Sequence, residues 1–546
     1  MRTLLAALLA CVALAAGPPR PAKGMVVSQD RLASEAGASV LRRGGNAVDA
    51  AVATAFALAV THPAAGNLGG GGFLVLRQPD GSSTTFDFRE VAPAAARPAT
   101  FLVEGRPDDD LRHERGTSVG VPGSVAGLHR AWRTQGRRPW ASLLAPAIRL
   151  AERGFDVSPV LARSLEEAWP RLSRHEGSRA AFGKEGKPLQ AGARLVQKDL
   201  GRTLRRIAAK GPAGFYEGAV AKAIVNEMRA TGGLITAADL KAYRVLERPA
   251  LKGTYRGWEV TAMGPPSSGG QVLLESLNLL EGWPLAELPE ARRLHLMAES
   301  LRRAFLDRAR HLGDPEANPA MPLTRLVSKP YAETLRKDLD PARASASDPS
   351  QAAQTAEPEH TTHLSVVDRE GRAVALTTTL EDSYGSAILV RGAGFLLNNE
   401  MGDFNAAPGL TDREGRIGTE PNLVRPGRRM LSSMCPAILA KGDDLLVVGS
   451  PGGRTIPSTV LCVVLALVDR GLGAQAAVDA PRIHHQWLPD RIQAEPGIPT
   501  AALEALGHVI KPVKKQGVAQ VIRVRGASVE GGADTGRYGD SAAVAE

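Results

Sequence analysis

The sequence predicts a mixed α/β protein in which a helix-rich part is followed by a strand-rich part, and three observations support this. Apolar residues recur at helical spacing across residues 122–310. Short alternating runs separated by turn residues begin near residue 360. Of the 546 residues, 43% are hydrophobic and 23% are charged, which supplies a core and excludes general disorder. The length allows several small domains or one large α/β body with a second lobe.

The first predicted elements are an apolar helix and a glycine-rich turn. Asn46 is expected to cap a helix over Ala47–Val60, and Pro63 ends it. This run is shorter than the ~20 residues that cross a bilayer and contains Asp49, so a buried helix is predicted. The sequence Asn67–Leu76 predicts a tight loop that leads into a strand.

The remaining elements follow from the same periodicities. Helices are expected over Trp140–Arg153, Leu200–Lys210, Ala219–Thr231, Glu290–Asp307 and Ser458–Arg470. Strands are expected over Thr84–Arg89, Thr362–Asp368, Ala373–Leu380, Gly394–Asn398 and Leu445–Val448. Between the two halves, residues 338–359 are polar and rich in Ala, Ser, Gln and Pro, which predicts an exposed flexible linker.

Charge and cysteine content exclude several function classes. The net charge of +10 comes from scattered basic residues, without a Lys/Arg-rich run or interleaved aromatics. A solvated basic surface is therefore predicted, and no nucleic-acid partner. Cys435 and Cys462 form neither a disulfide framework nor a zinc-ligand spacing.

The amino terminus resembles a secretory signal. Arg2 precedes the apolar run Leu4–Ala16, and Ala13-Leu14-Ala15 is a suitable cleavage site, so residues 1–16 are predicted to be removed. Cys11 loosely matches a lipoprotein box, which is a minor alternative. Export to the periplasm or the exterior is expected, with no membrane-spanning segment in the mature chain.

A nucleophile is indicated where the linker meets a strand. His360 is followed by Thr361 and Thr362 at the predicted strand start. Cleavage before Thr361 would free an α-amine with a pKa near ~8 beside its own hydroxyl, and this amine can act as the general base. An ordinary strand start is the alternative, because Thr is common in strands.

The chain resembles the gamma-glutamyltranspeptidases, a family of N-terminal-nucleophile hydrolases. Many short motifs in the same order carry the resemblance: Asn67–Phe73, Asp87–Glu90, Gly120–Gly123, Pro265–Gly270, Thr361–Asp403, Leu431–Met434, Gly449–Gly453 and Pro481–Trp487. The resemblance implies a four-layer αββα fold made of two chains, a large subunit (residues 17–360) and a small subunit (residues 361–546). It also implies self-cleavage and transfer of a γ-glutamyl group, as from glutathione, to water, amino acids or dipeptides. Neither metal nor organic cofactor is expected.

The family's roles transfer to matching positions. The resemblance implies Thr361 as nucleophile, His360–Thr361 as the cleaved bond, Thr379 as the partner of the nucleophile's amine, and Gly452 and Gly453 as the oxyanion hole. It implies that Arg89, Ser432 and Ser433 hold the substrate α-carboxylate, and that Glu381, Glu400 and Asp403 hold its α-ammonium. Glu381 stands where some members have Asn. These residue types suit the chemistry, because guanidinium binds carboxylate with two parallel bonds and glycine lets backbone N–H groups approach an oxyanion.

Two other functions and one local departure remain to be weighed. A related acylase for glutaryl amides is one alternative, although such a substrate would leave Glu400 and Asp403 without an ammonium. A binding protein that never matures is the other. Arg89 and Asp403 could also be a surface ion pair and a turn residue. Between Asp403 and Ser432, the segment Ala406–Arg429 matches the family's lid but has no aromatic residue, and Glu414 stands near the gate position. We therefore predict substantial hydrolysis beside transfer.

Overall fold

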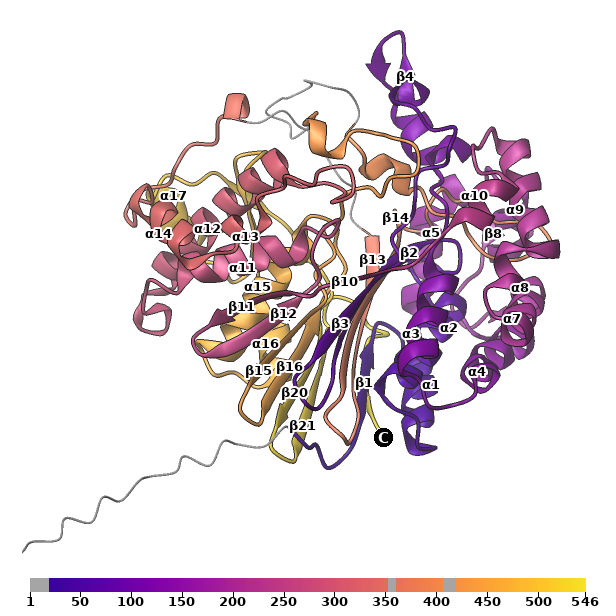
Figure 1. Cartoon of the computed structure of the whole chain (residues 1–546), viewed down its shortest axis with the longest axis horizontal. Coiled ribbons are helices and arrows are strands. Elements are labelled where there is room, and N and C mark those ends of the chain that lie inside the picture. Colours follow the sequence, from indigo (N-terminus) through magenta and orange to yellow (C-terminus); the bar gives the residue numbers. More distant parts are fainter. Residues whose placement is uncertain (1–18, 352–359, 406–417) are drawn as a thin grey trace, which may run out of the picture.

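Two large β-sheets lie face to face between two layers of helices (Figure 1). The structure is a computed structural model that describes residues 19–351, 360–405 and 418–546, and of His360 only the backbone. The predicted signal sequence therefore lies outside the described residues, as does Glu414 in the predicted lid.

The first sheet has seven antiparallel strands and contains strands from both halves of the chain. In spatial order they are β10 (Leu246–Arg248), β3 (Ser83–Asp87), β2 (Gly71–Arg77), β14 (Ala373–Glu381), β13 (His360–Val367), β1 (Met25–Ser28) and β22 (Ala542–Ala545). The register places Thr361 opposite Thr379 and Thr379 opposite Gly71. The predicted strand that begins at Thr361 and Thr362 is thus inside a sheet, with neighbouring strands on both sides.

The second sheet has six antiparallel strands. In order they are β11 (Leu251–Tyr255), β12 (Trp258–Ala262), β15 (Ala437–Lys441), β16 (Asp444–Gly449), β20 (Gln520–Arg525) and β21 (Ser528–Ala533). Smaller sheets are formed by β17 (Ile483–His484), β18 (Ile492–Ala494) and β19 (Ile510–Pro512), and by three two-stranded pairs: β4 (Leu102–Val103) with β5 (Arg106–Pro107), β6 (Phe155–Asp156) with β9 (Arg194–Leu195), and β7 (Gly183–Lys184) with β8 (Lys187–Pro188).

Helices cover the outer face of each sheet (Figure 1). Next to the first sheet are α1 (Arg31–Arg42), α2 (Ala47–Thr61) and α3 (Ser124–Gln135); farther out are α4 (Trp140–Arg153), α5 (Pro159–Leu172), α6 (Glu176–Phe182), α7 (Lys198–Lys210), α8 (Ala213–Tyr216), α9 (Gly218–Thr231) and α10 (Ala237–Ala242). The second sheet is covered by α11 (Gly269–Leu280), α15 (Thr455–Val468) and α16 (Ala474–Asp479), with α12 (Glu290–His311), α13 (Leu323–Leu326), α14 (Lys329–Lys337) and α17 (Thr500–Ala505) outside them. The implied four-layer αββα fold is confirmed.

The alternation of side chains along the strands explains the layers. In β2, Leu74 and Leu76 join the core beneath the helices, whereas Phe73 and Val75 join the core between the sheets. A strand buried on both faces needs apolar residues on both, which accounts for the unbroken apolar run. The same alternation turns the odd-numbered residues of β13, including Val367, toward the second sheet.

Helix α2 forms as predicted from its cap. The Asn46 side chain accepts a hydrogen bond from the Asp49 N–H, and Asp49 accepts one from the Asn46 N–H. This reciprocal arrangement satisfies two N–H groups that the first turn leaves open. All fifteen residues of the helix are buried, which its alanine-rich sequence permits because small side chains allow close packing.

Two predicted elements differ from the structure. Residues 394–398 form no strand but only isolated bridges, Leu389 with Leu396 and Gly69 with Leu397. The described part of the predicted linker, residues 338–351, is largely exposed as predicted, but it is held along α12. The Ser345 N–H and hydroxyl donate to Glu299, at 3.1 and 2.6 Å, because that buried carboxylate needs donors.

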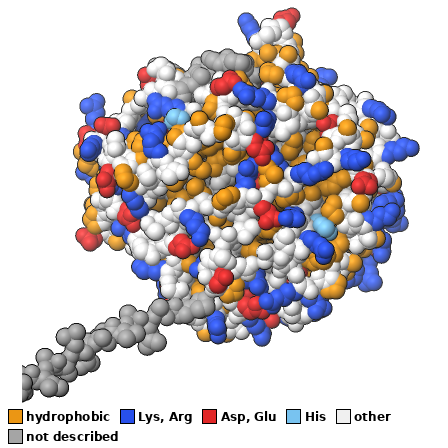
Figure 2. Space-filling view, viewed as in Figure 1, with side chains coloured by type: hydrophobic (Ala, Val, Ile, Leu, Met, Phe, Trp, Pro, Cys, Tyr) orange, Lys and Arg blue, Asp and Glu red, His pale blue; other side chains and the backbone are white. Residues whose placement is uncertain are grey.

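The surface carries the scattered charge expected from the sequence. Lys and Arg side chains alternate with Asp and Glu on the visible face (Figure 2). No helix within the described residues is long and apolar enough to cross a membrane.

Candidate active site

Most residues predicted for catalysis and substrate binding line one small cavity. Its volume is about 20 Å³, room for about one water molecule. Among its lining residues are Arg89, Thr361, Thr379, Glu381, Asp403, Ser432, Ser433 and Gly453. Gly452 lies in the wall of a larger adjacent cavity that Thr361 also lines. These residues come from the loop after β3, from the neighbouring strands β13 and β14, from the turn Glu400–Asp403, from the segment before β15 and from the loop after β16, so distant parts of the sequence meet here.

The position of Thr361 follows from strand pairing. It is buried at the end of β13, directly opposite Thr379 in β14. The Thr379 hydroxyl accepts a hydrogen bond from the Glu381 N–H at 2.7 Å. Strand β14 is in turn held by the Asn67 amide, which donates to the Thr379 carbonyl at 2.9 Å. Gly70 permits this approach, because a Cβ there would lie 2.0 Å from the same carbonyl oxygen.

The glycine turn after β16 lines the same two cavities as Thr361, through Gly452 in the larger and Gly453 in the smaller. Gly452 has φ of 126° and Gly453 has φ of 52°, both in the region that favours glycine. A Cβ on Gly452 would also lie 2.5 Å from the Thr455 hydroxyl. Because only glycine has this backbone freedom, the turn can present N–H groups beside the nucleophile, as an oxyanion requires.

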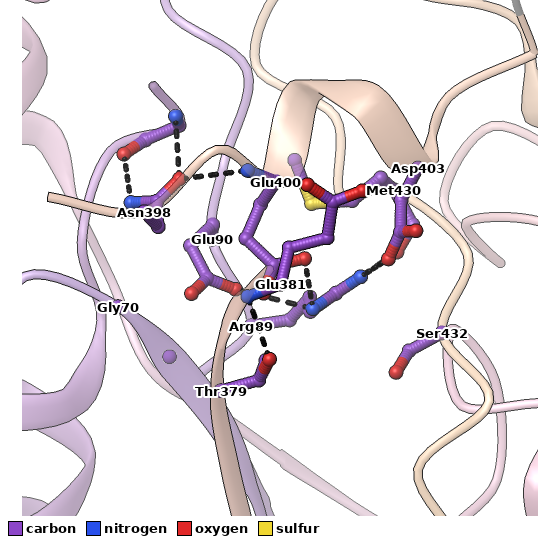
Figure 3. A network of polar contacts seen from close by, with 12 residues as sticks. Gly70, Arg89, Glu90, Thr379, Glu381, Asn398, Glu400, Asp403, Met430 and Ser432 are labelled. Carbon is purple, nitrogen blue, oxygen red and sulfur yellow. Dashed lines mark hydrogen bonds and ion pairs between the residues drawn. The ribbon is translucent and has the colours of Figure 1, made fainter. Parts of the chain in front are cut away.

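Arg89 is the centre of a buried charge cluster (Figure 3). Its guanidinium forms ion pairs with Glu400 at 2.5 Å, with Asp403, and with Glu90 at 3.4 Å. It also donates to the carbonyls of Met430 and Leu431, each at 3.3 Å. Burial acts to lower the pKa of Arg89, but Glu400, Asp403 and Glu90 raise it above its ordinary value. Arg89 is therefore always charged.

Carboxylates outnumber the cations that face them in this cluster. Burial raises the pKa of Glu400 and of Glu90 above the ordinary range, although Arg89 opposes the shift in both. Burial also raises the pKa of Glu381 well above its ordinary value, and Asp382 and Asp403 raise it further. An added cation would stabilise the ionised forms of these groups, so the cluster suits a ligand with an ammonium group.

Three predicted binding residues contact one another instead of lying at opposite ends of a binding pocket. Arg89 and Asp403, expected to hold opposite ends of a substrate, contact each other. Glu400 does not line the small cavity but lies behind it against Arg89. The backbone of His360 continues β13, with a register shift between His360 and Thr361.

Three supporting residues were not predicted. Arg308, buried in α12, donates to the hydroxyls of Ser268 at 2.8 Å and Ser433 at 3.2 Å. Glu90 faces Arg89, and its adjacency in the Asp87–Glu90 motif was the one available signal. His113 lies 3.4 Å from Glu381. Burial lowers the pKa of its imidazole, and the nearby positive charge of Arg112 lowers it further. The sequence holds no local signal for Arg308 or His113.

The turn Pro265–Gly270 holds the two serines in place. The Ser432 N–H donates to the Pro266 carbonyl at 2.8 Å, and the Ser268 N–H donates to the Ser432 carbonyl at 2.7 Å. This contact explains why a motif far upstream accompanies the site.

Within the described residues, neither His363 nor the buried group around His295 favours a metal ion. His363 is bonded to Thr377 at 2.8 Å and Ser365 at 3.1 Å, and burial lowers its pKa to about 3. His295, Glu299 and His508 lie close enough to share an ion. However, Glu299 is paired with Arg302 and Arg303, and two guanidiniums repel a dication.

Comparison with known proteins agrees with this geometry. Residues 33–544 match the family described as "Gamma-glutamyltranspeptidase". The chain belongs to the gamma-glutamyltranspeptidase family. It is 42% identical to the "Glutathione hydrolase proenzyme" of Escherichia coli, over 96% of this chain and 95% of that protein. It is 43% identical to a glutathione hydrolase proenzyme of a Pseudomonas species, over 90% and 88%.

A solved structure in this comparison has a different printed activity. The crystal structure of cephalosporin acylase from Bacillus halodurans superposes with a TM-score of 0.84, at 27% identity, over 100% of this chain and 99% of that one. The fold is therefore shared, across the whole chain, with a protein whose printed activity is that of an acylase.

Proposed function

We propose that this chain is a self-processing enzyme that cleaves γ-glutamyl amides, such as glutathione, and transfers the acyl group to water or to an amino acid or dipeptide. The observation that carries this proposal is the single cavity in which Thr361 meets both Arg89 and Asp403. A γ-glutamyl group ends in a carboxylate and an ammonium, and these are the two charges that such a pair recognises.

Maturation would use the same nucleophile. The Thr361 hydroxyl attacks the His360 carbonyl carbon, the peptide C–N bond breaks, and an ester forms while the nitrogen becomes the Thr361 amine. Water then hydrolyses the ester and releases the His360 carboxylate. The products are a large subunit ending at residue 360 and a small subunit of residues 361–546, as the word "proenzyme" in the relatives' names also suggests.

Catalysis would proceed through a γ-glutamyl ester on Thr361. The free α-amine takes the hydroxyl proton as oxygen attacks the γ-carbonyl carbon, and it gives that proton to the departing amine as the C–N bond breaks. The Gly452-Gly453 turn would bind the oxyanion. Water or an acceptor amine then attacks the ester, loses a proton, and restores the Thr361 hydroxyl. Thr379 would orient the amine.

Two experiments test the proposal. The smaller fragment of the purified protein should begin Thr-Thr-His-Leu-Ser, and Thr361→Ala should remain one uncut chain. Cleavage of this variant at the same bond would remove Thr361 from its role. Wild-type enzyme should hydrolyse γ-glutamyl-4-nitroanilide, and the rate of anilide cleavage should change when glycylglycine is added as an acceptor. An uncut, inactive wild-type chain would instead support the binding-protein alternative.

An acylase for glutaryl amides is the second candidate, favoured by the structural likeness to cephalosporin acylase. Against it stand the buried carboxylates of Asp403 and Glu381, which a glutaryl group would leave without an ammonium. Equal cleavage of glutaryl and γ-glutamyl anilides would favour the acylase. We further propose export, on the basis of the predicted signal sequence, which cell fractionation with detection of the large subunit would test.

A further inference from the structure

Thr361 separates the small charged cavity from a second, larger one. The larger cavity has a volume of about 470 Å³ and is lined by Thr361, Pro451 and Gly452 at its inner end. Its size is in the range of small-molecule sites. An acyl carbonyl held between Thr361 and the glycine turn, with its glutamyl end against Arg89 in place of Asp403, directs the leaving group into the larger cavity.

The outer end of this larger cavity carries two cations from distant parts of the chain. Arg163 belongs to α5, whereas Lys515 belongs to the segment between β19 and β20. Both side chains are exposed. Arg163 makes no ion pair with any residue in the described ranges, and Lys515 donates only to the Arg537 carbonyl, at 3.1 Å.

The other charged groups of the wall leave this positive charge largely uncompensated. Arg537 is neutralised by Glu495 and by Asp534 at 3.2 Å. Glu167, one helical turn beyond Arg163, is the acid among the described lining residues. Arg163 and Lys515 have no carboxylate partner, and Glu167 is the one carboxylate near them among the described lining residues. The net positive charge favours an anionic group at the mouth of the cavity.

We propose, resting on the function above, that the larger cavity holds the leaving group and the acceptor, and that Arg163 and Lys515 select those bearing a carboxylate. The ligand class is a small amino acid or dipeptide, whose amine lies at Thr361 and whose carboxylate lies at the mouth. A dipeptide spans ~7 Å, which lets it reach from a buried nucleophile toward the surface.

The test compares two substrates that differ in one carboxylate. The ratio of kcat/KM for γ-glutamyl-3-carboxy-4-nitroanilide to kcat/KM for γ-glutamyl-4-nitroanilide is measured in wild type, Arg163→Gln, Lys515→Gln and the double variant. Lys514→Gln is the matched control, because Lys514 is an exposed neighbour that does not line the cavity. The ratio should fall about two- to fivefold in each single variant and further in the double variant, as for exposed ion pairs.

Further readouts sharpen the result. Raised salt should lower the wild-type ratio, since screening weakens exposed pairs. Transfer to glycylglycine should exceed transfer to glycylglycinamide in wild type, and this preference should shrink in the double variant. Ratios equal in all variants, or lowered as much by Lys514→Gln, would overturn the inference. A wild-type enzyme that cleaves neither anilide overturns the proposed function and this inference with it, which is a distinguishable outcome.

Discussion

Replacing Arg89 tests the charge cluster most directly. Its guanidinium is buried and touches Glu400 at 2.5 Å, Asp403, and Glu90 at 3.4 Å, so Arg89→Ala leaves three carboxylates without their shared cation. Removing one partner of a buried ion pair costs about 3–5 kcal/mol. At about 1.4 kcal/mol per decade, this corresponds to a loss of about 150- to 4,000-fold in kcat/KM for a γ-glutamyl anilide.

Arg89→Lys separates charge from geometry. An ammonium keeps the positive charge but cannot bind a carboxylate through two parallel bonds, so one charge-assisted bond worth about 1.5–3 kcal/mol is lost. A loss of about 10- to 150-fold is expected. Both variants should still cut the chain before Thr361, which a gel would show, because His360 offers no zwitterion. Activity of Arg89→Ala within tenfold of wild type, in a folded and processed protein, would refute the reasoning.

Three further changes probe neighbouring groups. Asp403→Asn should lower kcat/KM for γ-glutamyl but not for glutaryl anilides, because the ammonium is what distinguishes them; an unchanged preference would argue against ammonium binding. Gly452→Ala should lose at least about tenfold in kcat, since its φ of 126° and the 2.5 Å approach to Thr455 force the oxyanion turn to shift; wild-type kcat would contradict this. Burial raises the pKa of Glu381, so an arriving ammonium should expel its proton, and kcat/KM should rise as pH rises through that raised pKa. Glu381→Gln should lose this part of the pH profile, and an identical profile would count against it.

Local sequence patterns predicted the elements whose signals are local. The cap at Asn46 correctly predicted the start of α2. The apolar spacing correctly predicted both ends of α4. The run at residues 394–398 also looked like a strand, but neighbouring strands occupy the sheet and only single bridges form. Periodicity shows that a segment is compatible with a strand. Whether the strand forms depends on whether a sheet edge is available to pair with it in the folded protein.

The family motifs predicted the residues of the site, but they did not predict the surrounding residues that hold those side chains in place. Arg308 steadies Ser433 from a helix far along the chain, and no pattern in the sequence relates the two. Likewise, the adjacency of Glu90 and Arg89 was visible, but not that the pair is buried. Spatial neighbours brought together by tertiary packing leave no periodic trace, so their contacts had to come from the structure.

The contact between Arg89 and Asp403 would make the binding of a charged ligand an exchange of ion pairs. The Asp403 carboxylate pairs with the guanidinium that we propose holds the substrate carboxylate. A ligand with only a carboxylate must expel Asp403 and strand it, while a ligand with only an ammonium leaves that carboxylate already engaged. A zwitterion would replace the ion pair between Arg89 and Asp403 with two ion pairs to the ligand, one through each residue. Under the proposed function, the pocket would therefore favour a ligand that carries both charges over a ligand that carries only one.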